Sequence, residues 1–343
     1  MEPNQHILNQ ILEQLQILKA ELKTESEQKE NFLLRAEAEN SWFTQSEIVR
    51  MIDAICEKYL DQKKLEFWLS NYHLNNSIPK TIGIIAAGNI PLVSFHDLLC
   101  TWVSPHKAEL KLSSKDKQLY YWIKTILEKH CPLLNQKTKF VERLNSFDAV
   151  IATGSDLASN QFRHYFEKVP HIIRAHRNSV AVLTKNCPSK EWHQLGDDIF
   201  NYFGLGCRNV SKIFIPEQFP LEELISSLDI DFAHLAHHPK YANNYDYQLA
   251  LCIMGKEEFI QGKTIIAKQS KLLNSPASVL HYEFYDDFSN LMLAFESKKD
   301  NLQCIVSDID PMHADLFAFG SAQRPELWDY SDGMDTLKFL AEL

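Results

Sequence analysis

Residues 81–91 read Thr-Ile-Gly-Ile-Ile-Ala-Ala-Gly-Asn-Ile-Pro, a short apolar run that ends in a turn. The run is rich in β-branched side chains, as is typical of a strand buried on both faces of a parallel sheet. An apolar helix to about Val103 follows, and Pro91 suits its first position because the missing N–H is not needed there. The stretch therefore predicts a strand, a turn and a helix, the repeating unit of an α/β protein with a mostly parallel sheet.

The alternation of strands and helices extends from this stretch to the C-terminus. Further strands are predicted over residues 107–112, 139–144, 148–153, 171–174, 179–184, 212–216, 277–285 and 303–306. Further helices are predicted over residues 115–129, 155–168, 191–203, 221–228, 240–254 with a continuation from 257, and 334–343. Before Pro79 the sequence is helical, over residues 7–22 and, in two pieces, 31–69. Thr44 or Ser46 could cap the second piece, and Thr44 with Glu47 has the spacing of a capping box.

Length and charge limit the class of protein. The chain has 343 residues, enough for about two domains, and a formal net charge of -10. This charge argues against nucleic acid as the main partner, although it is compatible with a local basic pocket for a small anion. The N-terminus is too polar for a signal peptide, and no apolar run is long enough to cross a bilayer. We therefore expect a cytoplasmic protein without membrane insertion.

Seven cysteines are scattered along the chain, and no two have CxxC spacing. A disulfide framework or a zinc site is therefore not expected, which fits a reducing cytosol. Cys207 differs from the others because Gly204 and Gly206 precede it, between a helical run and a strand. A thiol presented on such a turn can attack a carbonyl group. The alternative is a buried cysteine beside a helix-ending glycine, which is the commoner role of this residue type.

Three predicted strand ends carry polar groups, and ligands of open α/β sheets bind beyond the carboxyl ends of the strands. The residues concerned are Asn89, Lys111, Ser113, Ser114, Thr153, Gly154 and Ser155. The asparagine amide can donate to a developing oxyanion, the lysine can reach a ribose or a phosphate, and the amides of the last turn suit a phosphate. Each group also has a plainer interpretation, respectively a turn asparagine, a solvated strand end and an N-cap. No GxGxxG fingerprint follows the first strand.

A histidine cluster is the candidate for a metal site. His234, His237 and His238 lie close together, but no carboxylate stands among them at ligand spacing. A packed or solvated cluster is the better interpretation, and we expect no metal.

The order and separation of these pieces resemble the aldehyde dehydrogenase superfamily, and within it the acyl-CoA reductases typified by the bacterial luminescence fatty-acid reductase component. The resemblance covers residues 80–343 and rests on the motifs AGNIP at 87–91, KLSS at 111–114, ATGS at 152–155, the Cys207 turn and FGSAQ at 319–323. It implies a two-domain aldehyde-dehydrogenase-like α/β fold. The implied parts are a helical N-terminal region packed on the cofactor domain at 1–77, a cofactor-binding domain at 78–184, a catalytic domain at 185–318 and a C-terminal tail at 319–343.

The resemblance also implies roles for individual residues. Cys207 matches the nucleophile, and Asn89 matches the asparagine whose amide forms an oxyanion hole with the backbone N–H of the nucleophile. Lys111 matches the lysine that holds the adenosine ribose, and Ser113 and Ser114 are its neighbours. Thr153, Gly154 and Ser155 match the turn at the pyrophosphate.

Two departures from the superfamily bear on the reaction. Its oxidising members place a glutamate before a Gly-Gly pair as the general base for thioester hydrolysis, whereas residues 174–179 here read Arg-Ala-His-Arg-Asn-Ser. An enzyme that reduces a thioester benefits from excluding water instead. NAD-preferring relatives carry a glutamate at the position of Ser114, and Ser114 beside Lys115 would accept a 2′-phosphate. The resemblance therefore favours NADPH as the cofactor.

We therefore predict an NADPH-dependent reductase that converts an acyl-CoA thioester to the aldehyde through a covalent acyl-Cys207 intermediate and that can form a homo-oligomer. Two alternatives stay open, an aldehyde dehydrogenase that works in the oxidative direction and a non-catalytic binding protein that kept the fold. The helical segment predicted over residues 240–269 is a candidate wall for an acyl pocket, although apolar residues at helical spacing usually belong to a core.

Overall fold

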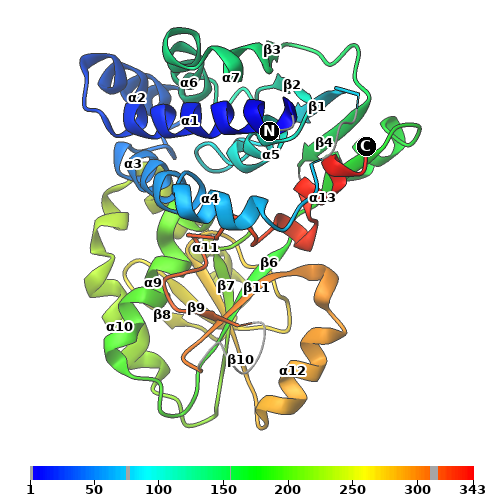
Figure 1. The fold of residues 1–343 in the computed structure, drawn as a ribbon. Helices are drawn as coiled ribbons and strands as arrows, with labels where there is room; N and C mark the ends of the chain where they lie inside the picture. Colours follow the sequence, from blue (N-terminus) through cyan, green and yellow to red (C-terminus); the bar gives the residue numbers. More distant parts are fainter. Residues whose placement is uncertain (1–2, 75–77, 155, 310–315) are drawn as a thin grey trace. The chain divides into compact units, whose positions relative to one another are not determined.

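The computed structural model describes residues 3–74, 78–154, 156–309 and 316–343 (Figure 1). The chain divides into two compact units. The first unit consists of Met1–His176 with Pro325–Leu343, and the second consists of Arg177–Arg324. Each unit has its own sheet, so the predicted fold class of two α/β parts with a helical N-terminal region is confirmed.

The sheet of the first unit has five parallel strands in the order β3-β2-β1-β4-β5. The strands are β1 (Thr81–Ile85), β2 (Lys107–Lys111), β3 (Thr138–Val141), β4 (Ala149–Thr153) and β5 (His171–Arg174). The chain runs outward from β1 to β3 and then returns to the other side of β1 with β4. The order of the strands therefore reverses between β1 and β4, where open α/β sheets bind their ligands.

The helices of the first unit surround this sheet in one or two layers or pack on one another. They are α1 (Pro3–Lys23), α2 (Glu27–Glu39), α3 (Gln45–Ala54), the π-helical turn Ile55–Tyr59, α4 (Gln62–Leu69), α5 (Phe95–Val103), α6 (Gln118–His130), α7 (Pro132–Gln136), α8 (Asp156–Tyr165) and α13 (Thr336–Ala341). Buried side chains of α1 and α4, such as Leu15 and Trp68, share one core with Ile84 and Leu110 of the sheet. The N-terminal helices are therefore part of the hydrophobic core of this unit. Thr44 N-caps α3 and accepts a hydrogen bond from the Glu47 N–H, as predicted.

The helix after β1 starts later than predicted. We expected Pro91 at its first position, but α5 starts at Phe95. Leu92 has a φ of 49°, in the left-handed region, and this conformation interrupts a right-handed helix. Residues 86–94 therefore form a true loop at the carboxyl end of β1.

The sheet of the second unit has seven strands in the order β12-β11-β6-β7-β10-β9-β8. The strands are β6 (Asn178–Val182), β7 (Val210–Ile215), β8 (Ile260–Gln261), β9 (Ile266–Gln269), β10 (Val279–Phe284), β11 (Leu302–Ser307) and β12 (Phe317–Ala318). All pairs are parallel except that of β8 with β9. Residues 78–184 were predicted to form the cofactor-binding domain, whereas β6, within this range, pairs with β7 and β11 in the second sheet.

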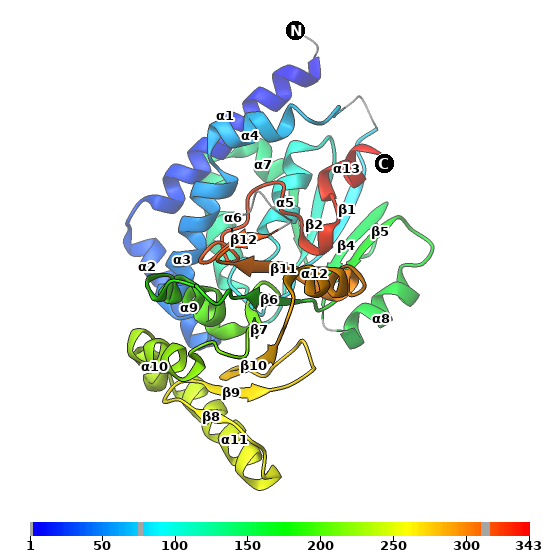
Figure 2. The same ribbon diagram turned by 90° about the horizontal axis from the view of Figure 1, so that it is seen from below.

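The described residues of the second unit form four longer helices: α9 (Trp192–Phe200), α10 (Leu221–Asp231), α11 (Pro239–Gly255) and α12 (Phe288–Glu296). Short helical turns lie at Ser189–Glu191, Asn201–Gly204, Ala233–His237 and Lys299–Asn301. Cys252 of α11 packs on Ile266 of β9 and Val279 of β10, and Figure 2 shows α11 beside the β8–β9 end of this sheet.

The continuation of α11 from residue 257 was predicted wrongly. The helix ends at Gly255, and Lys256 takes the left-handed conformation with a φ of 50°. Residues 260–269 instead form the β8–β9 hairpin, whose turn is closed by a 2.9 Å hydrogen bond from the Gly262 N–H to the Ile265 carbonyl. The β-branched isoleucines of this segment favour strands over helices.

Candidate active site

The predicted cofactor residues of the first unit lie at one edge of its sheet. β1 pairs with both β2 and β4, so the three strands that precede these residues are neighbours. The loop that carries Asn89 therefore lies between Lys111 with Ser113 and Ser114 on one side, and Thr153 with Gly154 on the other. Ser155 lies outside the described residues.

The loop after β1 packs closely against the loop after β2. The Ala86 N–H donates to the Lys111 carbonyl at 3.0 Å. A Cβ atom on Gly88 would lie 2.5 Å from Ser113 Oγ, so only glycine fits this approach. Asn89, next to Gly88, is exposed, and so are Ser114 and Lys115. This edge of the sheet thus presents the Asn89 amide, serine hydroxyl groups and lysine side chains where the two loops approach each other closely.

A buried aspartate that sequence reasoning missed supports this loop. Asp116 is 2% exposed and accepts a 2.7 Å hydrogen bond from the Leu92 N–H, the residue with the left-handed backbone. Burial raises the pKa of Asp116 to about 8. The only sequence signal was the position of Asp116 directly after the Ser113–Lys115 run, where it reads as an ordinary surface residue.

Glycine is required at position 154 for a structural reason that the sequence did not reveal. Its N–H donates to the Arg174 carbonyl at 3.2 Å and so extends the β4–β5 ladder. A Cβ atom there would lie 3.0 Å from Ala158 Cβ and 3.1 Å from Phe162 Cε2. This glycine lets α8 pack closely on the sheet, and its amide is already used within the protein.

In the second unit, Cys207 is distinguished by its exposure. All seven cysteines lie in the described part of the chain; six are buried, and Cys207 is half-exposed. Burial raises the pKa of Cys131 and Cys304 to about 11 and that of Cys187 to about 12. A buried thiol with a raised pKa is a poor nucleophile at neutral pH. Cys207 is therefore the cysteine best suited to attack a substrate.

The backbone before Cys207 is strained. Tyr202, Phe203 and Gly204 have φ values of 55°, 55° and 73°, three successive residues in the left-handed region. Each non-glycine residue in this region costs about 1–3 kcal/mol, and such strain concentrates at functional sites. The helix predicted to reach Phe203 accordingly ends at Phe200.

Asn209 holds the two sides of the Cys207 turn together. Its Oδ1 accepts from the Gly206 N–H at 2.8 Å. Its Nδ2 donates to the carbonyls of Asp198 at 3.1 Å, Ile199 at 3.2 Å and Asn201 at 2.8 Å. The side chain is 5% exposed in total, so these bonds are shielded from water. Sequence reasoning did not single out Asn209, because it reads as a turn residue between Cys207 and the next strand.

The Cys207 carbonyl is fixed from the neighbouring strand. Ser179 Oγ of β6 donates to it at 2.9 Å, and Cys304 Sγ of β11 donates to Ser179 Oγ at 3.0 Å. Arg208, directly after Cys207, is 8% exposed, and its guanidinium lies 5.9 Å from the centre of the Phe317 ring. The turn is thus anchored on both sides by the protein interior.

The tail motif at residues 319–323 is tied to α9. Asp198 Oδ2 accepts from the Gly320 N–H at 2.7 Å, and Oδ1 accepts from the Ala322 N–H at 3.0 Å. Asp198 is fully buried, and burial raises its pKa to about 7. The same residue gives its carbonyl to Asn209, so α9 joins the tail to the Cys207 turn.

A narrow slot lies beside this turn. Its lining includes Phe203, Asn209, Tyr241 and Ile265, and its volume of ≈ 30 Å³ leaves room for about two water molecules. The predicted wall of an acyl pocket at residues 240–269 therefore contributes two residues to a tight slot, not to an open channel.

The histidine cluster has packing roles. His238 N-caps α11, because its Nδ1 accepts from the Tyr241 N–H at 3.3 Å, and its ring lies 4.4 Å from that of Phe203. Within the described ranges, no three histidine, cysteine or acidic side chains gather in a way that could hold a metal ion. None of the helices in these ranges combines the length and the hydropathy that a bilayer crossing demands.

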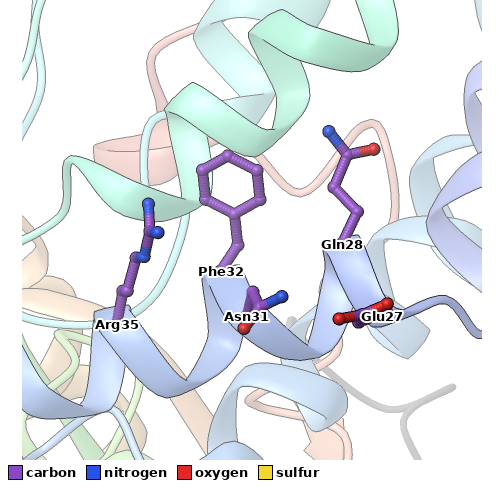
Figure 3. A pocket seen from close by; sticks show the side chains of 5 residues that line it. All are labelled: Glu27, Gln28, Asn31, Phe32 and Arg35. Carbon is purple, nitrogen blue, oxygen red and sulfur yellow. The ribbon is translucent and has the colours of Figure 1, made fainter.

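A larger hollow, of about 380 Å³, lies on the first unit along α2 (Figure 3). It is lined by Glu27, Gln28, Asn31, Phe32 and Arg35. None of the predicted site residues is among them, and the hollow holds no cysteine or histidine. It is a groove around the partly buried Phe32 ring and not part of the candidate site.

Several solved structures superpose on this chain. Aldehyde dehydrogenase 21 from Physcomitrella patens, in complex with the reaction product succinate, superposes with a TM-score of 0.68 at 13% identity, over 98% of this chain and 84% of that one. The indole-3-acetaldehyde dehydrogenase of P. syringae, in complex with NAD+ and IAA, gives a TM-score of 0.65 at 11% identity, over 90% and 72%. An aldehyde dehydrogenase from Bacillus cereus gives 0.64 at 13% identity, over 90% and 72%.

The chain therefore has the aldehyde dehydrogenase fold. No protein-family model matches the sequence, and no curated protein sequence matches it. At these identities the likeness concerns the fold, so activity and substrate must be argued from the site itself.

Proposed function

We propose that this protein is an oxidoreductase, an NADPH-dependent acyl-CoA reductase that works through an acyl-Cys207 intermediate. The observation that carries the proposal is the half-exposed Cys207 on a clamped turn, in a chain whose six other thiols are buried. The fold adds support, because structures titled aldehyde dehydrogenase share it. All seven cysteines lie in the described ranges and none of them forms a disulfide bond there, which fits a reducing cytosol.

The residues of the chain act as follows in this proposal. The Cys207 thiolate attacks the thioester carbonyl and forms a C–S bond, while the Asn89 amide and the Cys207 backbone N–H donate to the oxyanion. The adduct then breaks its bond to the CoA sulfur, CoA leaves as a thiolate, and the acyl group stays on Cys207. Bound NADPH supplies the hydride that reduces this acyl-enzyme. The resulting adduct expels the Cys207 thiolate and releases the aldehyde.

The sheet edge of the first unit fits a nucleotide cofactor. The close crossing of Gly88 and Ser113 lies beside the position where the strand order reverses, which suits a nucleotide. We assign Lys111 and Ser113 to the ribose, and the exposed Ser114 with Lys115 to the 2′-phosphate. Thr153 and Gly154 would line the pyrophosphate turn without the Gly154 N–H, which already donates to the Arg174 carbonyl, and Ser155 remains a prediction there.

The direction of the reaction is argued from the missing general base. Residues 174–179 contain no carboxylate. Arg174 at their start is 4% exposed, and its Nη1 pairs with Asp97 Oδ2 at 2.7 Å. Without a carboxylate there, hydrolysis of the acyl-enzyme is disfavoured and hydride transfer can compete. The oxidative direction is the second candidate, because the similar structures are titled aldehyde dehydrogenases.

The test follows NADPH absorbance over a panel of acyl-CoA thioesters from short to long chains. We expect NADPH consumption with at least one chain length, and radiolabel from acyl-CoA on Cys207 when NADPH is absent. Aldehyde with NADP+, assayed with and without CoA, reports the oxidative direction. No consumption in either direction, together with no acyl label on Cys207, would favour a non-catalytic binding protein. The same assays run on the separated oligomeric species would show whether a homo-oligomer is the active form.

A further inference from the structure

We propose that Asn209 is the positioning residue of Cys207: it fixes both the location of the nucleophile and the electrostatic field at its turn. The inference rests on the proposed function. Asn209 need not touch substrate or cofactor to act, because its amide is already occupied by backbone groups on both sides of the turn.

Asn209 holds a strained stretch of backbone in place. Three successive left-handed residues, 202–204, precede the turn, and such a backbone relaxes unless its surroundings hold it. Asn209 bonds to Asn201 before the strained residues and to Gly206 after them. It also closes the turn with its own N–H, which donates to the Gly206 carbonyl at 3.1 Å. A single side chain therefore bridges the strained segment and the residue directly before Cys207.

Asn209 also offsets partial negative charge at the end of α9. The last carbonyls of a helix have no partner within the helix and carry partial negative charge. Two of them, on Asp198 and Ile199 of α9, accept from Asn209 Nδ2. Uncovered carbonyls this close in the chain to Cys207 would disfavour its thiolate. Asn209 thus covers two carbonyls at the negative end of α9.

The orientation of the amide is settled by its surroundings. Three carbonyl oxygens face Nδ2 and one N–H faces Oδ1, so the reversed amide would lose all four bonds. An aspartate at this position would keep the bond to Gly206 and place a negative charge against three carbonyl oxygens. The Asn209→Ala and Asn209→Asp variants therefore separate loss of the clamp from reversal of its charge.

The experiment measures alkylation of Cys207 by iodoacetamide as a function of pH, followed by mass spectrometry, alongside kcat and KM. We expect the alkylation midpoint to move to higher pH in Asn209→Ala and further in Asn209→Asp. We expect kcat to fall by about 100-fold in Asn209→Ala, since misplacing a reacting group by about 1 Å has this effect. KM for NADPH should stay at the wild-type value.

The matched control is Asp229→Ala. Asp229 clamps the turn before β9, accepting from the N–H groups of Lys263 at 2.6 Å and Thr264 at 2.8 Å, in the same unit. Its loss should lower thermal stability as the Asn209 variants do and leave both the alkylation midpoint and kcat unchanged. Equal midpoints in Asn209→Ala, Asp229→Ala and wild type would overturn the proposal.

Two further outcomes are informative. If Asn209→Ala does not fold, Asn209→Ser, which keeps a short acceptor for Gly206, takes its place, and an unshifted midpoint there also overturns the proposal. Alkylation needs neither acyl-CoA nor NADPH. A wild-type protein without reductase activity would therefore count against the proposed function, while the alkylation series would still decide the role of Asn209.

Discussion

The loop after β1, residues 86–94, and the segment before β7, residues 201–209, hold strained backbone in different ways. Each contains non-glycine residues with positive φ, Leu92 in the first and Tyr202 with Phe203 in the second. Each is held by one buried polar side chain, Asp116 in the first unit and Asn209 in the second. We call these two side chains clamps: the Asp116 carboxyl group can ionise, whereas the Asn209 amide cannot.

This difference matters because of the pKa of each clamp. Burial raises the pKa of Asp116 to about 8, so its charge changes within the range of ordinary assays. An amide keeps its four bonds at every pH in that range. The loop that carries Asn89 is therefore expected to respond to pH, whereas the geometry of the Cys207 turn is expected to stay constant.

The largest effect is expected at the nucleophile of the second segment. Cys207→Ser should lower kcat by at least about 1000-fold, because a hydroxyl is far less nucleophilic than a thiolate near neutral pH. Stopped-flow measurement of CoA release checks this. The control Cys252→Ser alters a buried thiol of α11 and should cost stability but not activity. Equal rates in Cys207→Ser and wild type would remove the cysteine from the mechanism.

A smaller loss is expected in the loop of the first unit. Asn89→Ala should lower kcat by about 100-fold, the usual result of removing one oxyanion donor. Acyl labelling of Cys207 should slow in parallel, while the variant should stay folded because Asn89 is exposed. Asn71→Ala is the control: Asn71 is an exposed asparagine whose Nδ2 donates to the Phe67 carbonyl of α4 at 2.8 Å, so the variant should keep the wild-type kcat and lose a little thermal stability. A folded Asn89→Ala variant with full activity would show that the oxyanion is held elsewhere.

The sequence was informative where local composition decides structure. The strand-turn-helix unit at residues 81–103 was predictable because β-branched residues followed by Gly-Asn and Pro have few other conformations. Thr44 was predictable as an N-cap because the signal lies within four residues. The order of the strand ends then placed Asn89, Lys111 and Gly154 at one sheet edge.

The sequence was uninformative where a side chain acts on backbone brought near it by the fold. Asp116 and Leu92 are far apart in the chain, and no periodicity links them. Asn209 contacts α9 only because the segment before Cys207 takes positive φ values. The residue types of Tyr202 and Phe203 do not predict such values. The hairpin at residues 260–269 was missed because its isoleucines also fit a helical period, and sheet pairing decided between the two.

Cofactor choice tests the first unit alone. Ser114→Glu should reduce the preference for NADPH over NADH by about tenfold or more, since a carboxylate repels the 2′-phosphate and about 1.4 kcal/mol corresponds to a factor of ten. The ratio of kcat/KM for the two cofactors is the measurement. Glu217→Gln, at an exposed residue of the second unit, is the control for a change in surface charge. A preference unchanged by Ser114→Glu would place the 2′-phosphate away from this strand end.

The smallest effect concerns the clamp that can ionise. The pKa of Asp116 in the folded protein, about 8, lies above the ordinary value of 3.8, so the folded state binds this proton more tightly than the unfolded chain. Asp116 therefore lowers the free energy of unfolding progressively as the pH rises between these two values. Asp116→Asn keeps the acceptor for the Leu92 N–H without the charge, so it should raise Tm by several degrees at about pH 9 and less at about pH 6. Asn209→Asp supplies the opposite case, because it adds to the second clamp the charge that Asp116→Asn removes from the first, and its Tm should fall more steeply with pH than that of wild type. A constant Tm difference between Asp116→Asn and wild type across this range would mean that Asp116 does not titrate there, and the contrast between the two clamps would then lie in geometry alone.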